Sequence, residues 1–175
     1  MNDAFDIRGE SHIEVHKFRT GAIVIATLLA LVIQTSSPVH FSKLAILDLP
    51  LLVTIYFGLS RRNPSTGLLL GMAIGLLQDS LSGPTVPLGL YGIAKTIIGY
   101  LASSIGARLD TEHPLARFAL TGAFFVVHQA IVVLVQKVLL AQTQPLFTMK
   151  LLVATIVNSV LAVFLYFLLD RLRKS

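Results

Sequence analysis

The chain has 175 residues, of which 54% are hydrophobic and 13% charged, with a mean hydropathy of +0.78 and a formal net charge of +5. Ordinary soluble domains carry about 25% charged residues, so this composition excludes that class and indicates a polytopic membrane protein. The sequence contains no cysteine, which excludes disulfides, thiolate metal sites and cysteine nucleophiles. The basic residues stand at the ends of apolar runs and form no single patch, so we expect no nucleic-acid partner.

The apolar residues fall in runs of roughly 16 to 25, the length needed to cross a hydrocarbon core of ~30 Å. The connectors between the runs are short and rich in Pro, Ser and Asn. We therefore expect an all-α fold, a six-helix transmembrane bundle forming one domain over residues 1–175, without a cleaved signal peptide or a soluble domain. The predicted spans are about residues 21–35, 44–60, 65–81, 88–107, 115–140 and 147–169.

The basic residues also predict the orientation. Ten of them lie on one side of the predicted bilayer and three on the other, so the positive-inside rule places both termini in the cytoplasm, together with a polar N-terminal tail over residues 1–19. The larger set is Arg8, Lys17, Arg19, Arg61, Arg62, Arg108, Arg117, Arg171, Arg173 and Lys174, and the smaller set is Lys43, Lys137 and Lys150.

The second span carries a helix-start signature. Asp48 stands two positions before Pro50, which places an acid at the positive end of the helix dipole and a proline in the first turn. We expect Asp48 to cap this helix.

The first, third and fourth spans carry stripes of small residues. Because lipid gives helices no hydrophobic reason to associate, close approach at such residues supplies van der Waals contact. The stripes predict packing seams within the protein, or alternatively a docking face for a helix of another protein. They consist of Ala22, Ala26 and Ala30 in the first span, Gly67, Gly71 and Gly75 in the third, and Gly92, Gly99 and Gly106 in the fourth.

Ionisable groups at membrane depth are rare and mark functional sites by default. Asp79 ends the third span and Lys95 lies within the fourth, so in an antiparallel hairpin the acid could reach the base. The pair has two interpretations, a structural ion pair or a polar hub that faces a partner or a cavity. The candidate residues of the hub or partner interface are Asp48, Asp79, Tyr91 and Lys95.

Three polar residues, His128, Gln129 and Asn158, fall near the middle of the fifth and sixth spans, where interhelical hydrogen bonding is the default interpretation. One isolated histidine does not form a metal site. No nucleophile with an adjacent base, pair of carboxylates or phosphate-cradling loop occurs in the sequence. We therefore expect a protein that is not an enzyme, with no catalytic residue, cofactor or metal.

Residues 71–100 contain a glycine-rich helix ending in Gly-Leu-Leu-Gln-Asp, a Ser-Gly turn, and Pro-Leu-Gly-Leu-Tyr-Gly opening the next helix. This pattern resembles the MreD family of rod shape-determining proteins. The Asp-Leu-Pro-Leu-Leu run at residues 48–52 and the length of the chain fit as well. The family-like positions are Asp48, Pro50, Gly71, Gly75, Asp79, Gly83, Pro87, Gly89, Tyr91 and Gly92.

This resemblance implies a non-catalytic scaffold or regulator of the cell-elongation complex in the bacterial inner membrane. Its implied partners are MreC, through MreC the penicillin-binding transpeptidase and the RodA glycosyltransferase, and MreB on the cytoplasmic side. The competing hypothesis is a substrate-binding subunit similar to those of energy-coupling-factor vitamin transporters. Those are also six-span proteins of this size, and the stripe at Ala22, Ala26 and Ala30 is similar to their coupling face.

Overall fold

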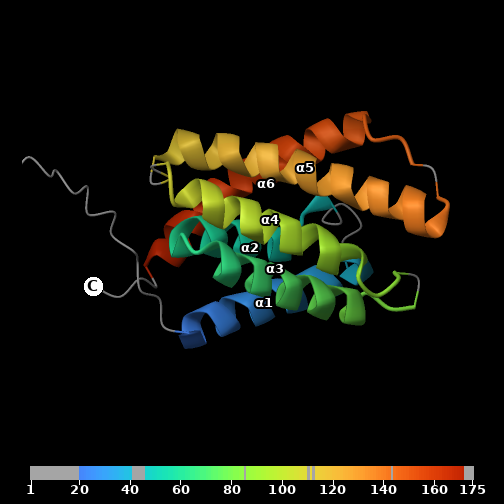
Figure 1. Ribbon diagram of the computed structural model, residues 1–175, viewed down its shortest axis with the longest axis horizontal. Helices are drawn as coiled ribbons and strands as arrows, with labels where there is room; N and C mark the ends of the chain where they lie inside the picture. Colours follow the sequence, from blue (N-terminus) through green and yellow to red (C-terminus); the bar gives the residue numbers. More distant parts are fainter. Residues whose placement is uncertain are drawn as a thin grey trace, which may run out of the picture.

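The computed structural model describes residues 20–40, 46–84, 86–109, 111, 113–142 and 144–171, with the side chains of the first helix described from 21 to 36. These residues form six α-helices and no strand, which confirms the all-helical class (Figure 1). The helices are α1 (Thr20–His40), α2 (Leu49–Arg61), α3 (Pro64–Leu81), α4 (Leu90–Gly106), α5 (Pro114–Leu140) and α6 (Met149–Asp170).

Four of the six helices lie within two residues of their predicted bounds at each end, and the first two differ more. Helix α1 continues five residues past the predicted end at position 35, through the Ser-Ser-Pro sequence that the prediction assigned to a connector. Helix α2 begins five residues later than predicted, because Asp48 accepts a hydrogen bond from the Leu51 amide (3.0 Å) and Pro50 occupies the first turn. Cap and proline together set its start.

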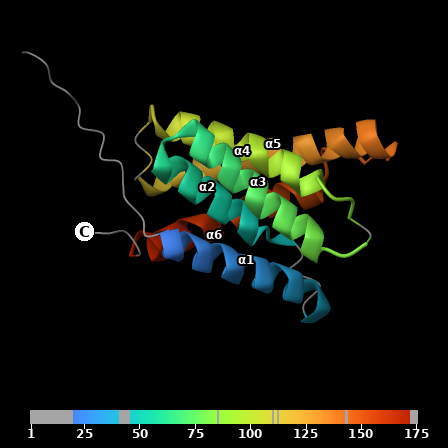
Figure 2. The ribbon, with the colours of Figure 1, turned by 60° about the horizontal axis from the view of Figure 1, so that its bottom comes forward.

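Helix α2 forms the centre of the bundle. Every residue from Pro50 to Ser60 is buried, and α2 packs against each of the other five helices. Helices α1 and α5 lie on opposite sides of it (Figures 1 and 2).

The helices alternate in direction along the bundle, so α1, α3 and α5 begin at the end where α2, α4 and α6 finish (Figure 1). Helices α2 and α4 are therefore parallel neighbours, and their N-terminal ends lie together. This arrangement positions the polar side chains described below.

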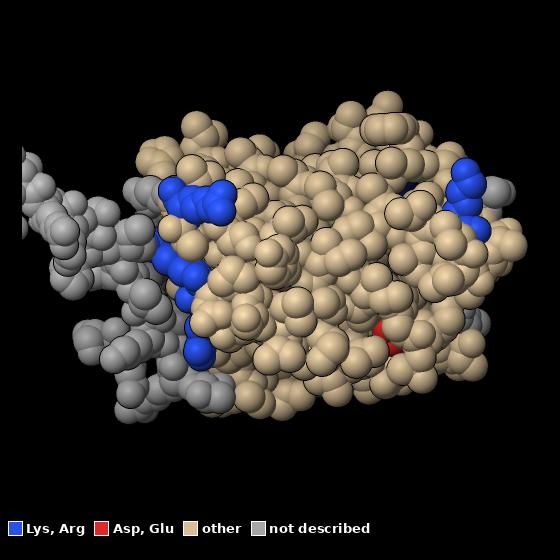
Figure 3. All heavy atoms as spheres, in the orientation of Figure 1, with Lys and Arg blue, Asp and Glu red and all other residues tan. Residues whose placement is uncertain are grey.

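By length and composition, α5 and α6 are the two described helices able to cross a membrane, and 21–36 and 49–61 are shorter apolar helical segments. On the face drawn in Figure 3, Lys and Arg gather at the two ends of the molecule, and the area between them is uncharged except for one small acidic patch toward the right. Large apolar side chains, including Leu28, Leu134 and Phe164, are more than half exposed on the outside of the bundle. Such a surface is typical of a protein that lipid covers.

Candidate functional site

A buried ion pair joins α2 to α4. The Lys95 ammonium lies 3.1 and 3.0 Å from the two carboxylate oxygens of Asp48, and Lys95 is completely buried, whereas the Asp48 side chain is 15% exposed. The partner of Lys95 is thus Asp48, not Asp79 as the hairpin suggested. The parallel alignment of α2 and α4 brings the two N-terminal ends together across 47 positions of sequence.

Two aromatic side chains complete the surroundings of Lys95. Its Nζ lies 3.5 Å from Nε2 of His128 on α5 and 5.2 Å from the centre of the Tyr91 ring on α4. The Tyr91 and His128 rings stack on each other with centroids 6.2 Å apart. The ammonium therefore has a carboxylate, an imidazole nitrogen and the face of a phenol ring as neighbours, so it is partnered although buried.

Two amide side chains hold the segment that leads into α2. Asn158 of α6 accepts from the Asp48 amide (3.0 Å) and donates to the carbonyls of Ile46 (2.9 Å) and Ala154 (2.8 Å). Gln34 of α1 accepts from the Leu49 amide (3.1 Å) and donates to the Leu47 carbonyl (2.9 Å). We call Asp48, Lys95, His128, Tyr91, Asn158 and Gln34 the polar cluster. It ties α1, α2, α4, α5 and α6 together at one end of the bundle.

Asp79 has a different role: it lies at the end of α3 and caps the N-terminus of α4. Its carboxylate accepts from the backbone amides of Gly89 (2.9 Å), Tyr91 (3.0 Å) and Gly92 (3.0 Å). The N-cap residue of α4 is Gly89, at φ 98°, where a side chain would be strained and where glycine offers no capping oxygen of its own. The acid that ends α3 supplies the missing acceptor, and it is 2% exposed.

The glycines of α3 and α4 lie where the two helices touch. A methyl group added at Gly71 would collide with the Lys95 carbonyl, one at Gly75 with the Tyr91 carbonyl, and one at Gly99 with the Gly67 carbonyl. Gly67 itself faces Ser103 and Gly99, Gly92 faces Leu76, and Gly106 faces the backbone of Leu59 on α2. The helices approach through backbone atoms at these points, which permits the van der Waals contact that replaces the hydrophobic effect in lipid.

A second polar cluster at the opposite end of the bundle joins α2, α5 and α6. The Arg117 guanidinium contacts Asp170 at 2.6 Å and donates through Nε to the Thr111 carbonyl (3.0 Å). The Tyr56 hydroxyl donates to the other Asp170 oxygen (2.8 Å), and Tyr166 and Thr121 share a hydrogen bond of 3.1 Å. This cluster was not predicted from the sequence, where Arg117 served only as a topology signal and Asp170 was given no role.

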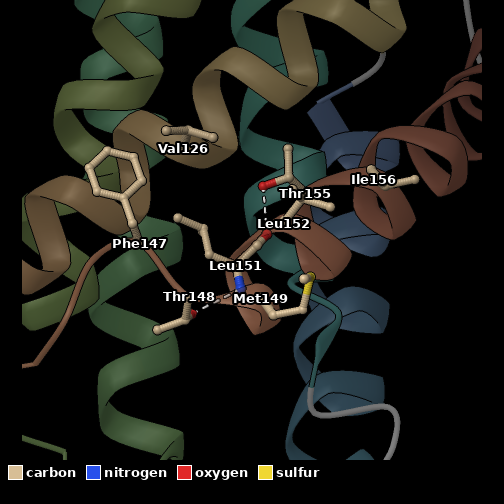
Figure 4. A pocket seen from close by; sticks show the side chains of 8 residues that line it. All are labelled: Val126, Phe147, Thr148, Met149, Leu151, Leu152, Thr155 and Ile156. Atoms are coloured by element: carbon tan, nitrogen blue, oxygen red, sulfur yellow. Dashed lines mark hydrogen bonds between the residues drawn. The ribbon is translucent and has the colours of Figure 1, made fainter.

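Two grooves open beside the first polar cluster. A groove of about 430 Å³ between α4, α5 and α6 is lined by Tyr91 together with Gln129, Gln136, Gln144, Thr148 and Lys150 among apolar neighbours. An adjoining groove of about 450 Å³ between α5 and α6 is almost entirely apolar (Figure 4). The two share Thr148, whose hydroxyl caps α6 by accepting from the Leu151 amide at 3.1 Å.

These contacts define what the site can do chemically. Among the described residues no set of three or more His, Asp or Glu side chains could hold a metal ion. The carboxylates of Asp48 and Asp79 and the ammonium of Lys95 are each used in contacts between helices. The arrangement fixes helices relative to one another and leaves amide groups and Tyr91 at the edge of an open groove.

Apolar helices, basic ends and a bundle joined by internal polar contacts define a helical membrane protein. The family model described as rod shape-determining protein MreD matches residues 17–175, nearly the whole chain. The chain therefore belongs to the MreD family and is a rod shape-determining membrane protein. No match was found among the curated proteins or among the solved structures.

Proposed function

We propose that this protein is a non-catalytic scaffold of the cell-elongation complex. In this proposal it spans the bacterial inner membrane six times with both termini in the cytoplasm. It binds MreC and helps couple MreB to peptidoglycan synthesis by the penicillin-binding transpeptidase and RodA. Membership of the MreD family carries the proposal.

The polar cluster supports a scaffold because its charged groups are used internally. Lys95 is completely buried and paired with Asp48, and the amide side chain of Asn158 is also completely buried. A scaffold must present its partners with a fixed surface, and hydrogen bonds from α1, α4 and α6 to the segment that leads into α2 fix the surface at this end. Five of the six proposed packing glycines do the same for α3 and α4, and Gly106 does so for α4 and α2.

The polar groove beside Tyr91 supports a partner-binding role. Its three glutamines and Lys150 offer hydrogen-bond donors and acceptors, which a helix or adjoining segment of a membrane partner can satisfy. Of the four residues proposed as hub or interface, Tyr91 is the one that lines this groove. We assign the groove to MreC.

One support for the vitamin-transporter hypothesis was the similarity of the stripe at Ala22, Ala26 and Ala30 to a coupling face, which must be exposed to bind another protein. Ala30 is 6% exposed and belongs to the core, and Ala26 packs against that core. The stripe therefore faces inward for at least part of its length, which favours the scaffold over the transport subunit.

The orientation has a direct test. Reporter fusions after Ser175 should give a cytoplasmic signal and fusions near Gln142 an extracytoplasmic one, because the basic residues favour the end where α6 finishes. Arg61, Arg62, Arg108, Arg117 and Arg171 lie at that end among the described residues, against Lys137 and Lys150 at the other. An extracytoplasmic Ser175 would contradict the proposed topology.

The partner has a test of its own. Affinity purification of the full chain from native membranes should recover MreC, and replacing both Gln129 and Gln136 by leucine should reduce the recovery at least about threefold, the effect of losing one or two interhelical hydrogen bonds. Gln142→Leu is the matched control, since it makes the same change at the same end outside the groove. Undiminished recovery in the double variant would place the MreC interface elsewhere, and no MreC in any preparation would refute the proposed function.

A further inference from the structure

A third groove lies at the opposite end of the bundle, where α1, α2 and α3 meet. Its volume is about 400 Å³, and it runs between the first turns of α1, the last turns of α2 and the first half of α3. The lining is apolar except at one end, where Arg61 and Thr66 stand. The residues along its length are Ile23, Val24, Phe57, Gly67, Leu69, Leu70 and Ala73.

The groove has an apolar length that suits an acyl chain and a polar end that suits a lipid headgroup. From Thr66 to Ala73 the α3 wall extends about 10 Å along the helix axis, and both rims expose apolar side chains, with Val24 at 50% and Leu69 at 57% exposure. The groove is therefore open sideways toward the surrounding hydrocarbon, and its wall contains no charged side chain deeper than Arg61.

The charged end of the groove carries an unused hydrogen-bond donor. Nε of Arg61 is buried and has no hydrogen-bond partner among the described residues. Helix α3 begins at Pro64, only three residues after Arg61, and its first-turn residue Thr66 also lines the groove, although the Thr66 amide is already capped by Asn63. The positive end of this helix dipole therefore lies at the same end of the groove as Arg61. A guanidinium and a helix N-terminus together favour a phosphate group.

We propose that this groove binds an anionic phospholipid, with one acyl chain along α1 and α3 and the phosphate on Arg61. The proposal needs the chain to be embedded in a membrane but does not depend on MreC. The site lies at the basic end of the bundle, where the proposed orientation puts the cytoplasmic leaflet. Nothing in the polar cluster at the other end contributes to it.

The test compares lipids retained by the purified full-length protein. Detergent-solubilised protein is incubated with phosphatidylglycerol or phosphatidylcholine of identical acyl chains, and bound lipid is counted by native mass spectrometry. We expect the parent to retain phosphatidylglycerol preferentially and Arg61→Gln to lose about fivefold of that preference, the effect of one basic residue at an anionic surface. Arg61→Lys keeps the charge and should keep most of the preference.

Two further variants separate the site from general effects. Arg108→Gln removes the same charge at the same end outside the groove, and it should leave the preference unchanged. Ala73→Trp fills the apolar part of the groove from an exposed position, and it should lower retention of both lipids.

The proposal is overturned if Arg61→Gln has no effect or if Arg108→Gln has the same effect, since either result means diffuse attraction to basic residues. It is also overturned if phosphatidylglycerol binds only after deletion of residues 1–19, because that segment would then be the occupant. Displacement of the lipid by inorganic phosphate at matched ionic strength would indicate a simple anion site. Recovery of MreC with the Arg61→Gln variant is measured in parallel and should equal that of the parent.

Discussion

Gly71→Ala should abolish most of the folded protein, although it adds only a methyl group. The new Cβ would lie against the Lys95 carbonyl, which is backbone and cannot rotate away. Helices α3 and α4 must then separate, and that movement also shifts Lys95 away from Asp48. Overpacking ordinarily costs about 1–3 kcal/mol, and a clash with backbone belongs at or above the upper limit. Monodisperse protein remaining after heating in detergent measures the loss.

Gly21→Ala is the matched control because no atom of the described residues lies within 4 Å of the position that its Cβ would take. Gly21 is also helical, so this change should leave stability unaltered or raise it by about 0.5–1 kcal/mol through the reduced backbone entropy of the unfolded chain. Equal behaviour of the two variants would show that α3 and α4 do not touch at Gly71.

Removing one charge of the buried ion pair should be far more damaging than removing both. Asp48→Asn preserves the shape of the side chain and an oxygen for the Leu51 amide but leaves the completely buried Lys95 without a carboxylate. Breaking such a pair costs about 3–5 kcal/mol. Lys95→Gln should be milder, since Asp48 is 15% exposed and still caps α2. The double variant Asp48→Asn with Lys95→Gln should recover folded yield and thermal stability.

The control for this cycle replaces Asp79. Asp79→Asn combined with Lys95→Gln should be worse than either change alone, because Asp79 serves the amides of α4 and not the ammonium. Rescue of Lys95→Gln by Asp79→Asn, with none by Asp48→Asn, would mean that Lys95 pairs across the hairpin after all. Recovery of MreC with the rescued double variant then shows whether the charges are needed for association or only for folding.

Much of the helical architecture was predictable because the signals are local. Apolar runs, short connectors and the Asp-Leu-Pro signature locate the helices, and the helix that follows Asp48 is capped by that residue. The four-residue spacing of Gly67, Gly71 and Gly75 places them on one helix face from sequence alone. In the structure that face lies against α4.

The partner of Lys95 was not predictable because it depends on which helices are neighbours. Adjacency in sequence favours Asp79, the nearest acid, but parallel packing of α2 on α4 brings in a residue 47 positions away. Asp79 instead caps α4. The sequence does indicate the need for this cap, because a helix that starts at glycine has no capping side chain of its own. The Arg117–Asp170–Tyr56 cluster depends on the same kind of distant contact.

The burial of α2 has a consequence for the order of events during synthesis. This helix is the second to leave the ribosome, yet α3, α4, α5 and α6, which cover most of its surface, are all made after it. The chain is synthesised from its N-terminus at about 5–20 residues per second. Asp48 therefore has no ion-pair partner until the residues up to Lys95 have been translated. The hydrogen bond from its amide to Asn158 forms only after α6 has been made. The last helix made closes the cluster around the second.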